Sequence, residues 1–227
     1  MNNSTAILIF ANSGQQEGIS KPFRSSQLLF DELNRKTIAK VEKTGLPYFL
    51  FSENEQVGNS FGERYTNAIQ AVYDRGYENV ITIGNDTPQL QAGQLLKTAR
   101  HLETQKIVLG PSKDGGYYLM GLHKSQFNVQ TFLKLPWKTS RLTQRISRLF
   151  SAKKIQAVFL KVLQDIDTVL DIRALLNSFQ KFTKTLLLIL RSVVSESSQI
   201  FSKYLFFSSS FQKRSPFNKG SPLLLPI

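Results

Sequence analysis

The sequence contains no cysteine and only two histidines, and these absences exclude several kinds of catalytic site. Without thiols the chain cannot form disulfides, thiolate zinc sites, iron–sulfur clusters or a cysteine nucleophile. The histidines, His101 and His123, stand alone, and neither has a second metal ligand at the helical spacing of four residues. We therefore interpret both as surface or structural residues. Nothing in the chain demands an oxidising compartment.

Long hydrophobic runs are also absent. The most apolar run, Leu186–Leu190, is bounded by Lys184 and Arg191 and is far shorter than the roughly 20 residues that cross a bilayer. The apolar stretch 6–11 is too short for the core of a secretory signal, and no basic segment precedes it. The sequence predicts a cytoplasmic protein that is at most peripheral to a membrane.

Acidic residues are scarce in one half of the chain only. Residues 1–120 hold 12 basic and 12 acidic side chains, whereas residues 121–227 hold 17 basic and 4 acidic ones and so carry the whole formal charge of +13. Such a distribution indicates a neutral domain with one electropositive side, suited to polyphosphate ligands, anionic membranes or nucleic acid. No interleaved basic and aromatic residues of an RNA-binding sheet are present, which disfavours nucleic acid as a partner.

The hydrophobic pattern predicts an α/β fold. Apolar runs rich in β-branched and aromatic residues alternate with helical patterns, which is typical of a mostly parallel sheet covered on both faces. The expected strands are 6–11, 48–53, 80–85, 107–112, 117–122 and 157–163. The expected helices are about 26–43, 62–75, 91–104, 139–151 and 168–180. Because ligands bind beyond the carboxyl ends of parallel strands, the residues after each strand are the informative ones.

The pattern changes after residue 180. Apolar side chains between 186 and 205 repeat at helical spacing and predict an amphipathic helix, whereas the Ser-, Pro- and Gly-containing basic stretch that follows predicts disorder. We therefore expect a domain over 1–180, a helix over 181–205 and a disordered tail over 206–227. The helix must bury its apolar stripe on its own domain, on a second subunit in a homodimer, or in a membrane surface, and the first is favoured.

Three acidic segments follow predicted strands, and each also has a plain structural interpretation. Asp86 in Gly84-Asn85-Asp86-Thr87-Pro88 is placed to hold a divalent cation against phosphate, or else it starts a turn or caps a helix. In Lys113-Asp114-Gly115-Gly116, the glycines permit close approach of an anion and Asp114 can accept hydrogen bonds from substrate hydroxyls, but Asp-Gly is also a strong hairpin signal.

The third segment is Asp165-Ile166-Asp167-Thr168. If it is extended, the two carboxylates point to opposite sides, so that only one faces the crevice as a second metal ligand. The structural alternative is that Asp167 or Thr168 caps the helix that follows.

In this order, NDTP (85–88), GPSKDGGYYLMGL (110–122), LPW (135–137) and DIDT (165–168) resemble a known family. The similarity is to the bacterial glycosyltransferase-A-type family called selenodomain-associated transferase 1, whose motifs read GSDCPDL, GPAEDGGYYLIGL and DVDT. It covers about residues 6–178 and is most specific at 107–122. Gly62-Glu63-Arg64 also matches the family's LGER segment.

The resemblance implies a three-layer, Rossmann-like α/β/α fold of the nucleotide-diphospho-sugar transferase type, with a mostly parallel mixed sheet. It implies Mg²⁺ or Mn²⁺ at Asp86 and Asp167, and a nucleotide-sugar or an NTP as the donor. By the same resemblance Asp114 is the catalytic candidate. The substrate-binding candidates that it implies are Arg64, Asp114, Gly115, Gly116 and Tyr117.

One segment departs from the family pattern. The family's phosphate loop after the first strand ends in KTRL, whereas this chain has ANSGQQEGISKPFRSS at 11–26. Lys21 and Arg24, with Gly14 and Gly18, could form a basic phosphate loop in its place. Trp137 is interpreted as a core anchor in preference to a lid or acceptor-site aromatic.

The leading functional hypothesis is therefore metal-dependent transfer from a nucleotide-activated donor, most simply glycosyl transfer to an unknown acceptor. A nucleotidyltransferase that releases pyrophosphate is the alternative reaction. A binding module that has lost the phosphate loop and its catalytic activity is the alternative from another class.

Overall fold

A mixed sheet forms the centre of the protein. The computed structural model describes residues 4–21, 23–178 and 181–211, with the backbone alone for 198–211. Its strands are β1 (Thr5–Phe10), β2 (Tyr48–Phe51), β3 (Asn79–Ile83), β4 (Ile107–Pro111), β5 (Tyr117–His123) and β6 (Ala157–Phe159), in the order β2-β1-β3-β5-β4-β6. Only β5 runs antiparallel to its neighbours. The predicted mostly parallel mixed sheet is confirmed.

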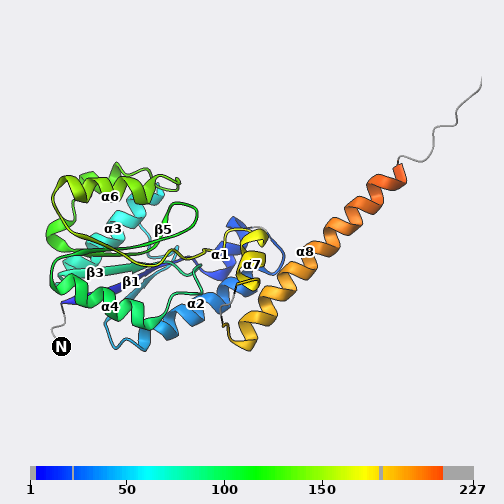
Figure 1. The fold of residues 1–227 in the computed structure, drawn as a ribbon, viewed down its shortest axis with the longest axis horizontal. Helices are drawn as coiled ribbons and strands as arrows, with labels where there is room; N and C mark the ends of the chain where they lie inside the picture. The colour runs from blue at the N-terminus through cyan, green and yellow to red at the C-terminus, as the bar shows by residue number, and fades with distance from the viewer. Residues whose placement is uncertain (1–3, 22, 179–180, 212–227) are drawn as a thin grey trace, which may run out of the picture.

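Helices cover both faces of this sheet, as Figure 1 shows. On one face lie α3 (Phe61–Asp74), α5 (Val129–Leu133) and α6 (Leu142–Ala152), and on the other lie α2 (Ser26–Glu42) and α4 (Ala92–Glu103). The alternation of side chains along β1 explains how one strand serves both layers: Ala6 and Leu8 pack toward α3, whereas Ile7 and Ile9 pack toward the opposite layer. The three-layer α/β/α architecture is therefore as predicted.

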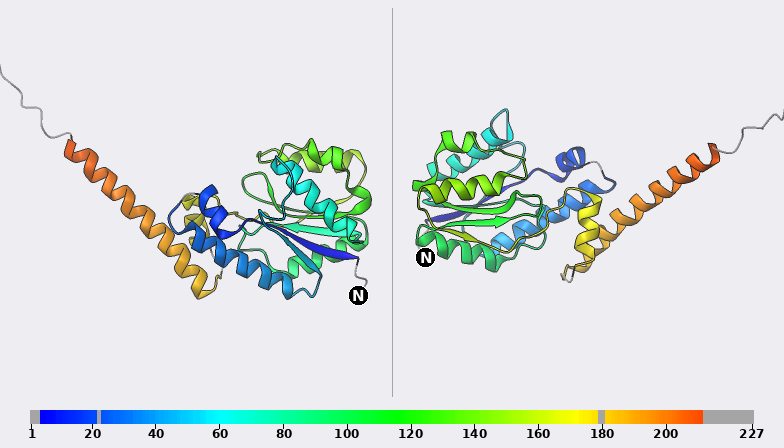
Figure 2. Two further views of the ribbon diagram at one scale, coloured as in Figure 1. Left: turned by 180° about the vertical axis from the view of Figure 1, so that it is seen from behind. Right: turned by 45° about the horizontal axis from the view of Figure 1, so that its top comes forward.

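A smaller helical group lies beside the sheet, at the end where β1 and β3 terminate (Figure 2). It consists of α1 (Gly14–Ser20), α7 (Val169–Leu176), the first half of α8 (Lys184–Phe211) and the N-terminal part of α2. Leu186, Leu190 and Val193 of α8 are fully buried against α2 and α7. Burial of each such side chain contributes about 1.5–3 kcal/mol. The start of the apolar stripe is thus buried on its own domain.

The predicted elements agree with the observed ones in most places. The strand predicted at 157–163 stops at Phe159, and the helix predicted at 168–180 stops at Leu176. Helices α1 and α5 and the short 3₁₀ helix at Lys124–Gln126 were not predicted. Helix α8 extends past residue 205 to Phe211, and the remainder of the predicted tail, 212–227, lies outside the described residues. In the described part of the chain, no helix combines the length and apolarity needed to cross a bilayer.

Candidate active site

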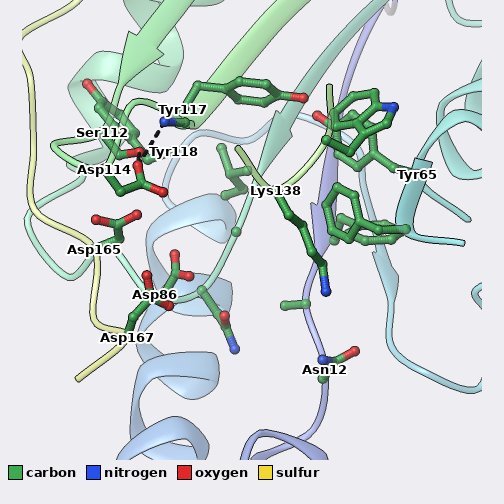
Figure 3. Close-up of a pocket in the computed structure, with 18 of the residues that line it drawn as sticks. Asn12, Tyr65, Asp86, Ser112, Asp114, Tyr117, Tyr118, Lys138, Asp165 and Asp167 are labelled. Carbon is green, nitrogen blue, oxygen red and sulfur yellow. Dashed lines mark hydrogen bonds between the residues drawn. The ribbon is translucent and has the colours of Figure 1, made fainter. Parts of the chain in front are cut away.

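A cavity of about 510 Å³ opens beyond the carboxyl ends of β1 and β3 (Figure 3). Its walls come from the chain just after β1 and β3, from the loops that follow β4 and β6, and from the segment before α6. The N-terminal end of β5 also lies here, because that strand runs antiparallel to its neighbours. This position matches the ligand crevice expected for an open α/β sheet.

Backbone hydrogen bonds hold the three acidic segments together at this edge. The Ile166 amide donates to the Asp86 carbonyl over 3.0 Å, which links the β3 loop to the segment after β6. The Lys113 amide donates to the Leu163 carbonyl over 3.1 Å, which links the β4 loop to the same segment. Motifs about 80 and about 50 residues apart are therefore joined by main-chain contacts, which fix the backbone positions from which the carboxylates project.

Asp114, Asp165 and Asp167 form a cluster whose carboxylate oxygens lie within 4.8 Å of one another. Burial, together with the negative charges of Asp86, Asp114 and Asp167, raises the pKa of Asp165 to about 7. A cation bound between these carboxylates would relieve that repulsion. Clustered carboxylate oxygens are the ligands that Mg²⁺ and Mn²⁺ prefer, so the donor set fits a divalent metal ion.

The turn after β4 holds Asp114 in place. Its Oδ1 accepts hydrogen bonds from the Gly116 amide, over 2.8 Å, and from the Ser112 hydroxyl. These two bonds occupy one carboxylate oxygen and leave the other open to the cavity. Gly116 lines the cavity, and a Cβ there would lie 3.1 Å from Asp114 Oδ1. Any side chain at position 116 would therefore disturb Asp114.

Gly115 serves the loop itself and does not line the cavity. Its φ of 92° lies in the left-handed region, and a Cβ there would come within 2.7 Å of Ser140 Cα. The Gly115 carbonyl accepts a hydrogen bond from the Thr143 amide over 3.1 Å. Its lack of a side chain thus allows the turn to pack against the segment that leads into α6.

Lys21 forms ion pairs with carboxylates at the edge of the cavity. Its Nζ lies 2.9 Å from Asp167 Oδ1 and 3.5 Å from Asp86 Oδ2, and it donates to the Ile166 carbonyl over 2.7 Å. Burial alone would lower the pKa of Lys21, but the carboxylates of Asp86, Asp167 and Glu17 outweigh it and hold that pKa above its usual value. The ammonium group neutralises the negative charge on one side of the acidic cluster.

The segment expected to form a phosphate loop is largely helical, which corrects that interpretation. Gly14–Ser20 forms α1, with the Ser13 side chain as its N-cap. Gly14 is needed for packing, because a Cβ there would meet Asp31 of α2 at 2.6 Å. Arg24 lies outside the cavity: its side chain is 63% exposed and pairs at 3.8 Å with Glu196 of α8.

The other side of the cavity is aromatic. Trp137 packs against Phe61 and Tyr65 of α3, with ring centroids 5.6 and 5.0 Å apart, and its Nε1 donates to the Phe132 carbonyl over 2.8 Å. Tyr117 lies beside Tyr65 at 6.3 Å, and burial raises its pKa well above the usual value. Trp137 is thus both the core anchor that was predicted and part of the cavity wall.

Two cations line the cavity with no carboxylate partner among the described residues, Arg64 and Lys138. The Nε of Arg64 is buried and has no hydrogen-bond partner. Lys138 projects between the carboxylates and Tyr65 in Figure 3, and its Nζ lies 5.4 Å from the centre of the Phe61 ring. Both groups are therefore free to bind an anion.

The structure brings most of the predicted site residues into one cavity, namely Lys21, Arg64, Asp86, Asp114, Gly116, Tyr117 and Asp167. Asp86 lies outside the three-carboxylate cluster and faces Lys21. The prediction that only one of Asp165 and Asp167 faces the crevice, made for an extended segment, is wrong. Both line the cavity, because β6 ends at Phe159 and the alternation of an extended strand does not reach them.

The comparisons with known proteins agree with this fold. Residues 27–139 match the family DUF2064, described as "Uncharacterized protein conserved in bacteria". No curated protein matches the sequence. The crystal structure of a candidate nucleotide-diphospho-sugar transferase from Desulfovibrio desulfuricans G20 aligns with a TM-score of 0.74 and 21% identity, over 86% of this chain and 98% of that one. At that identity the match shows the fold.

Two further structures are more distant. The 4-diphosphocytidyl-2C-methyl-D-erythritol synthase from Anaerococcus prevotii DSM 20548 has a TM-score of 0.47 and 13% identity, over 86% of this chain and 100% of that one. The manganese complex of Rv0371c from Mycobacterium tuberculosis H37Rv has a TM-score of 0.43 and 15% identity, over 77% and 98%. The fold assignment rests on the Desulfovibrio structure, whose nucleotide-diphospho-sugar transferase fold this chain shares.

Proposed function

We propose that this chain, which matches DUF2064 over residues 27–139, is a metal-dependent transferase that uses a nucleotide-activated donor and most simply transfers a glycosyl group. The finer family assignment, selenodomain-associated transferase 1, is part of the same proposal. A nucleotidyl transfer that releases pyrophosphate would use the same groups and is the alternative reaction.

One observation carries this proposal: a single cavity holds a carboxylate cluster on one side and unpaired cations with aromatic rings on the other. Three carboxylates placed so close together favour binding of a cation, and positive charge around its oxygens favours binding of a phosphorylated ligand. The cavity volume of about 510 Å³ lies within the range of small-molecule and cofactor sites. A donor that carries both a phosphate chain and a ring system would use both sides.

Each group in the cavity would have its own role in glycosyl transfer. Asp165 and Asp167 would hold Mg²⁺ or Mn²⁺, which would neutralise charge on a phosphate leaving group, and Asp114 beside them keeps its free oxygen for proton transfer. The open oxygen of Asp114 would accept the proton of the acceptor hydroxyl as the hydroxyl oxygen bonds to the sugar's anomeric carbon. The bond from that carbon to the diphosphate breaks, and the nucleoside diphosphate leaves with the electron pair. Trp137 and Tyr65 would exclude water from the cavity.

A binding assay tests the proposal directly. Isothermal calorimetry with Mn²⁺ and a panel of nucleoside triphosphates and nucleotide-sugars should reveal at least one ligand that binds only when the metal is present. Asp114→Asn and Asp167→Asn should abolish that binding, because each removes a charge from the cluster. Asp74→Asn is the matched control, since Asp74 is exposed at the end of α3 and accepts a hydrogen bond from Gln70 on the same helix.

The reaction products separate the two reactions. Glycosyl transfer releases a nucleoside diphosphate, whereas nucleotidyl transfer releases pyrophosphate, and a coupled enzyme assay for each distinguishes them. Failure of every nucleotide in the panel to bind with Mn²⁺ would refute the proposal and leave the non-catalytic interpretation.

A further inference from the structure

We propose that Lys138, together with Arg64, is the phosphate-binding cation pair of this cavity and receives the diphosphate group of the donor, in place of Lys21 and the segment after β1. The inference rests on the proposed function and names the residues that recognise its ligand. It relocates phosphate binding from the N-terminal segment to the loop that precedes α6.

Lys21 is not available for this task. Three of its neighbours are carboxylates, Asp167 at 2.9 Å, Asp86 at 3.5 Å and Glu17 at 3.7 Å, and the Ile166 carbonyl takes a further hydrogen bond. To bind phosphate, the ammonium group would have to leave these partners and expose their buried charges, which is costly. Lys21 is therefore a structural counter-ion of the acidic side.

Lys138 is in the opposite situation. It pairs with no carboxylate among the described residues, and Figure 3 shows its side chain passing through the middle of the pocket, with the carboxylates on one side and Tyr65 on the other. An anion bound at Lys138 would thus have the carboxylate cluster on its other flank. That arrangement suits an oxygen-rich anion that also contacts a metal ion, which is the chemistry of a diphosphate.

The backbone holds Lys138 in this position at a cost. Its φ of 56° lies in the left-handed region, which side-chain-bearing residues seldom adopt. The adjacent Trp137 fixes the loop, because it fills the space over Gly62, where a Cβ would lie 2.5 Å from its ring. A glycine at position 138 would adopt this φ without strain, so the cation can be removed there without a backbone penalty.

Arg64 provides the second cation. It lies on α3 one turn after Phe61, the ring that Lys138 covers, so both residues belong to the same side of the cavity. Its Nε is buried without a hydrogen-bond partner, and buried donors in native proteins are nearly always satisfied. A guanidinium group binds phosphate oxygens through paired, charge-assisted hydrogen bonds, so a phosphate ligand would satisfy this donor.

The chain offers a matched control for the test. Lys154 has the same φ of 56°, is exposed after α6 and does not line the cavity. Lys138→Gly and Lys154→Gly therefore make the same chemical change in the same backbone conformation, and both should leave the melting temperature equal or slightly higher. Only the first removes a cation from the cavity.

The probe is inorganic pyrophosphate with Mn²⁺, measured by isothermal calorimetry on the full chain. Loss of a charge-assisted hydrogen bond should weaken binding by about 10- to 100-fold in Lys138→Gly, and Arg64→Met should show a similar loss. Lys154→Gly should bind as the wild type does. Inorganic phosphate, run in parallel, represents a phosphorylated acceptor.

Four results would overturn the inference. They are unchanged pyrophosphate affinity in Lys138→Gly, a larger loss in Lys21→Met than in Lys138→Gly, a loss confined to inorganic phosphate, and no pyrophosphate binding by the wild type. None of these four results tests the proposed function, which is tested separately by the nucleotide panel and the carboxylate variants.

Discussion

Gly115→Ala should destabilise the protein more than its backbone angle alone explains. The new methyl group would meet two penalties. One is the φ of 92°, which is unfavourable for any residue with a Cβ, and the other is overlap with the main chain of Ser140. Because Ser140 is backbone at this contact, it cannot yield by changing a rotamer, and the segment carrying Lys138 must move instead.

The two penalties can be estimated separately. A left-handed conformation costs an alanine roughly 1–2 kcal/mol, and overpacking against backbone costs roughly 1–3 kcal/mol more. The unfolding free energy should therefore fall by about 2–5 kcal/mol. For a chain of this length, each kcal/mol lowers the melting temperature by about 2–4 °C.

Gly76→Ala is the control that separates the two contributions. Gly76 has a φ of 93°, and nothing lies within 4 Å of a Cβ built there, so this variant meets the angular penalty alone. Urea unfolding followed by the fluorescence of Trp137, the single tryptophan, measures both variants. An equal loss of stability in the two would refute the argument that Gly115 exists to admit Ser140.

Three further predictions follow from burial and charge. The pKa of Asp165, about 7, lies above its unfolded value, so this one carboxyl destabilises the metal-free protein increasingly as pH rises from about 4 to 7. Relative to the wild type, Asp165→Asn should therefore gain about 1–2 kcal/mol over that range after solvent screening, measured by unfolding at several pH values. Burial lowers the pKa of Lys40 to about 8, so the charged side chain destabilises the folded protein at pH 7. Lys40→Met should therefore raise the free energy of unfolding by about 1–3 kcal/mol at pH 7, even though it removes the hydrogen bond to the Pro88 carbonyl. This gain should shrink as the pH is raised toward 10. Deleting 206–227 should leave the melting temperature unchanged. Deleting 181–227 should expose the apolar surface under α8 and cause aggregation, which light scattering detects. If the full chain co-sediments with vesicles and the 181–227 deletion does not, the helix has a membrane role instead.

The strands were predictable because the signal for a buried strand is local. The apolar run from Ala6 reads as a strand on composition alone, and the tertiary structure places it second from one edge of the sheet, between β2 and β3. Helix α1 was not predictable in this way. Gly14–Ser20 contains two glycines and only one large apolar residue, Ile19, and that residue is exposed. It is helical because its Ser13 cap and its packing on α2 override a weak propensity.

The acidic side of the candidate site was predictable in part. Asp86, Asp114 and Asp167 follow predicted strands, and strand ends converge at one edge of a parallel sheet. Asp165 was missed because the length of β6, which decides whether alternation applies, depends on pairing with β4. No signal in the sequence marked Lys138, since a lysine after Trp137 reads as an ordinary surface residue.

The sequence by itself therefore determined the strands and the longer helices, the class of fold and the segments that carry the chemistry, because these depend on local hydrophobic pattern and on residue type. Only the tertiary structure decided which cation meets which carboxylate. Lys21 and Lys138 are alike in the sequence, but one is buried between Asp86 and Asp167 whereas the other projects unpaired into the cavity. Electrostatic pairing depends on distances in space between residues far apart in the chain, and only the folded structure sets those distances.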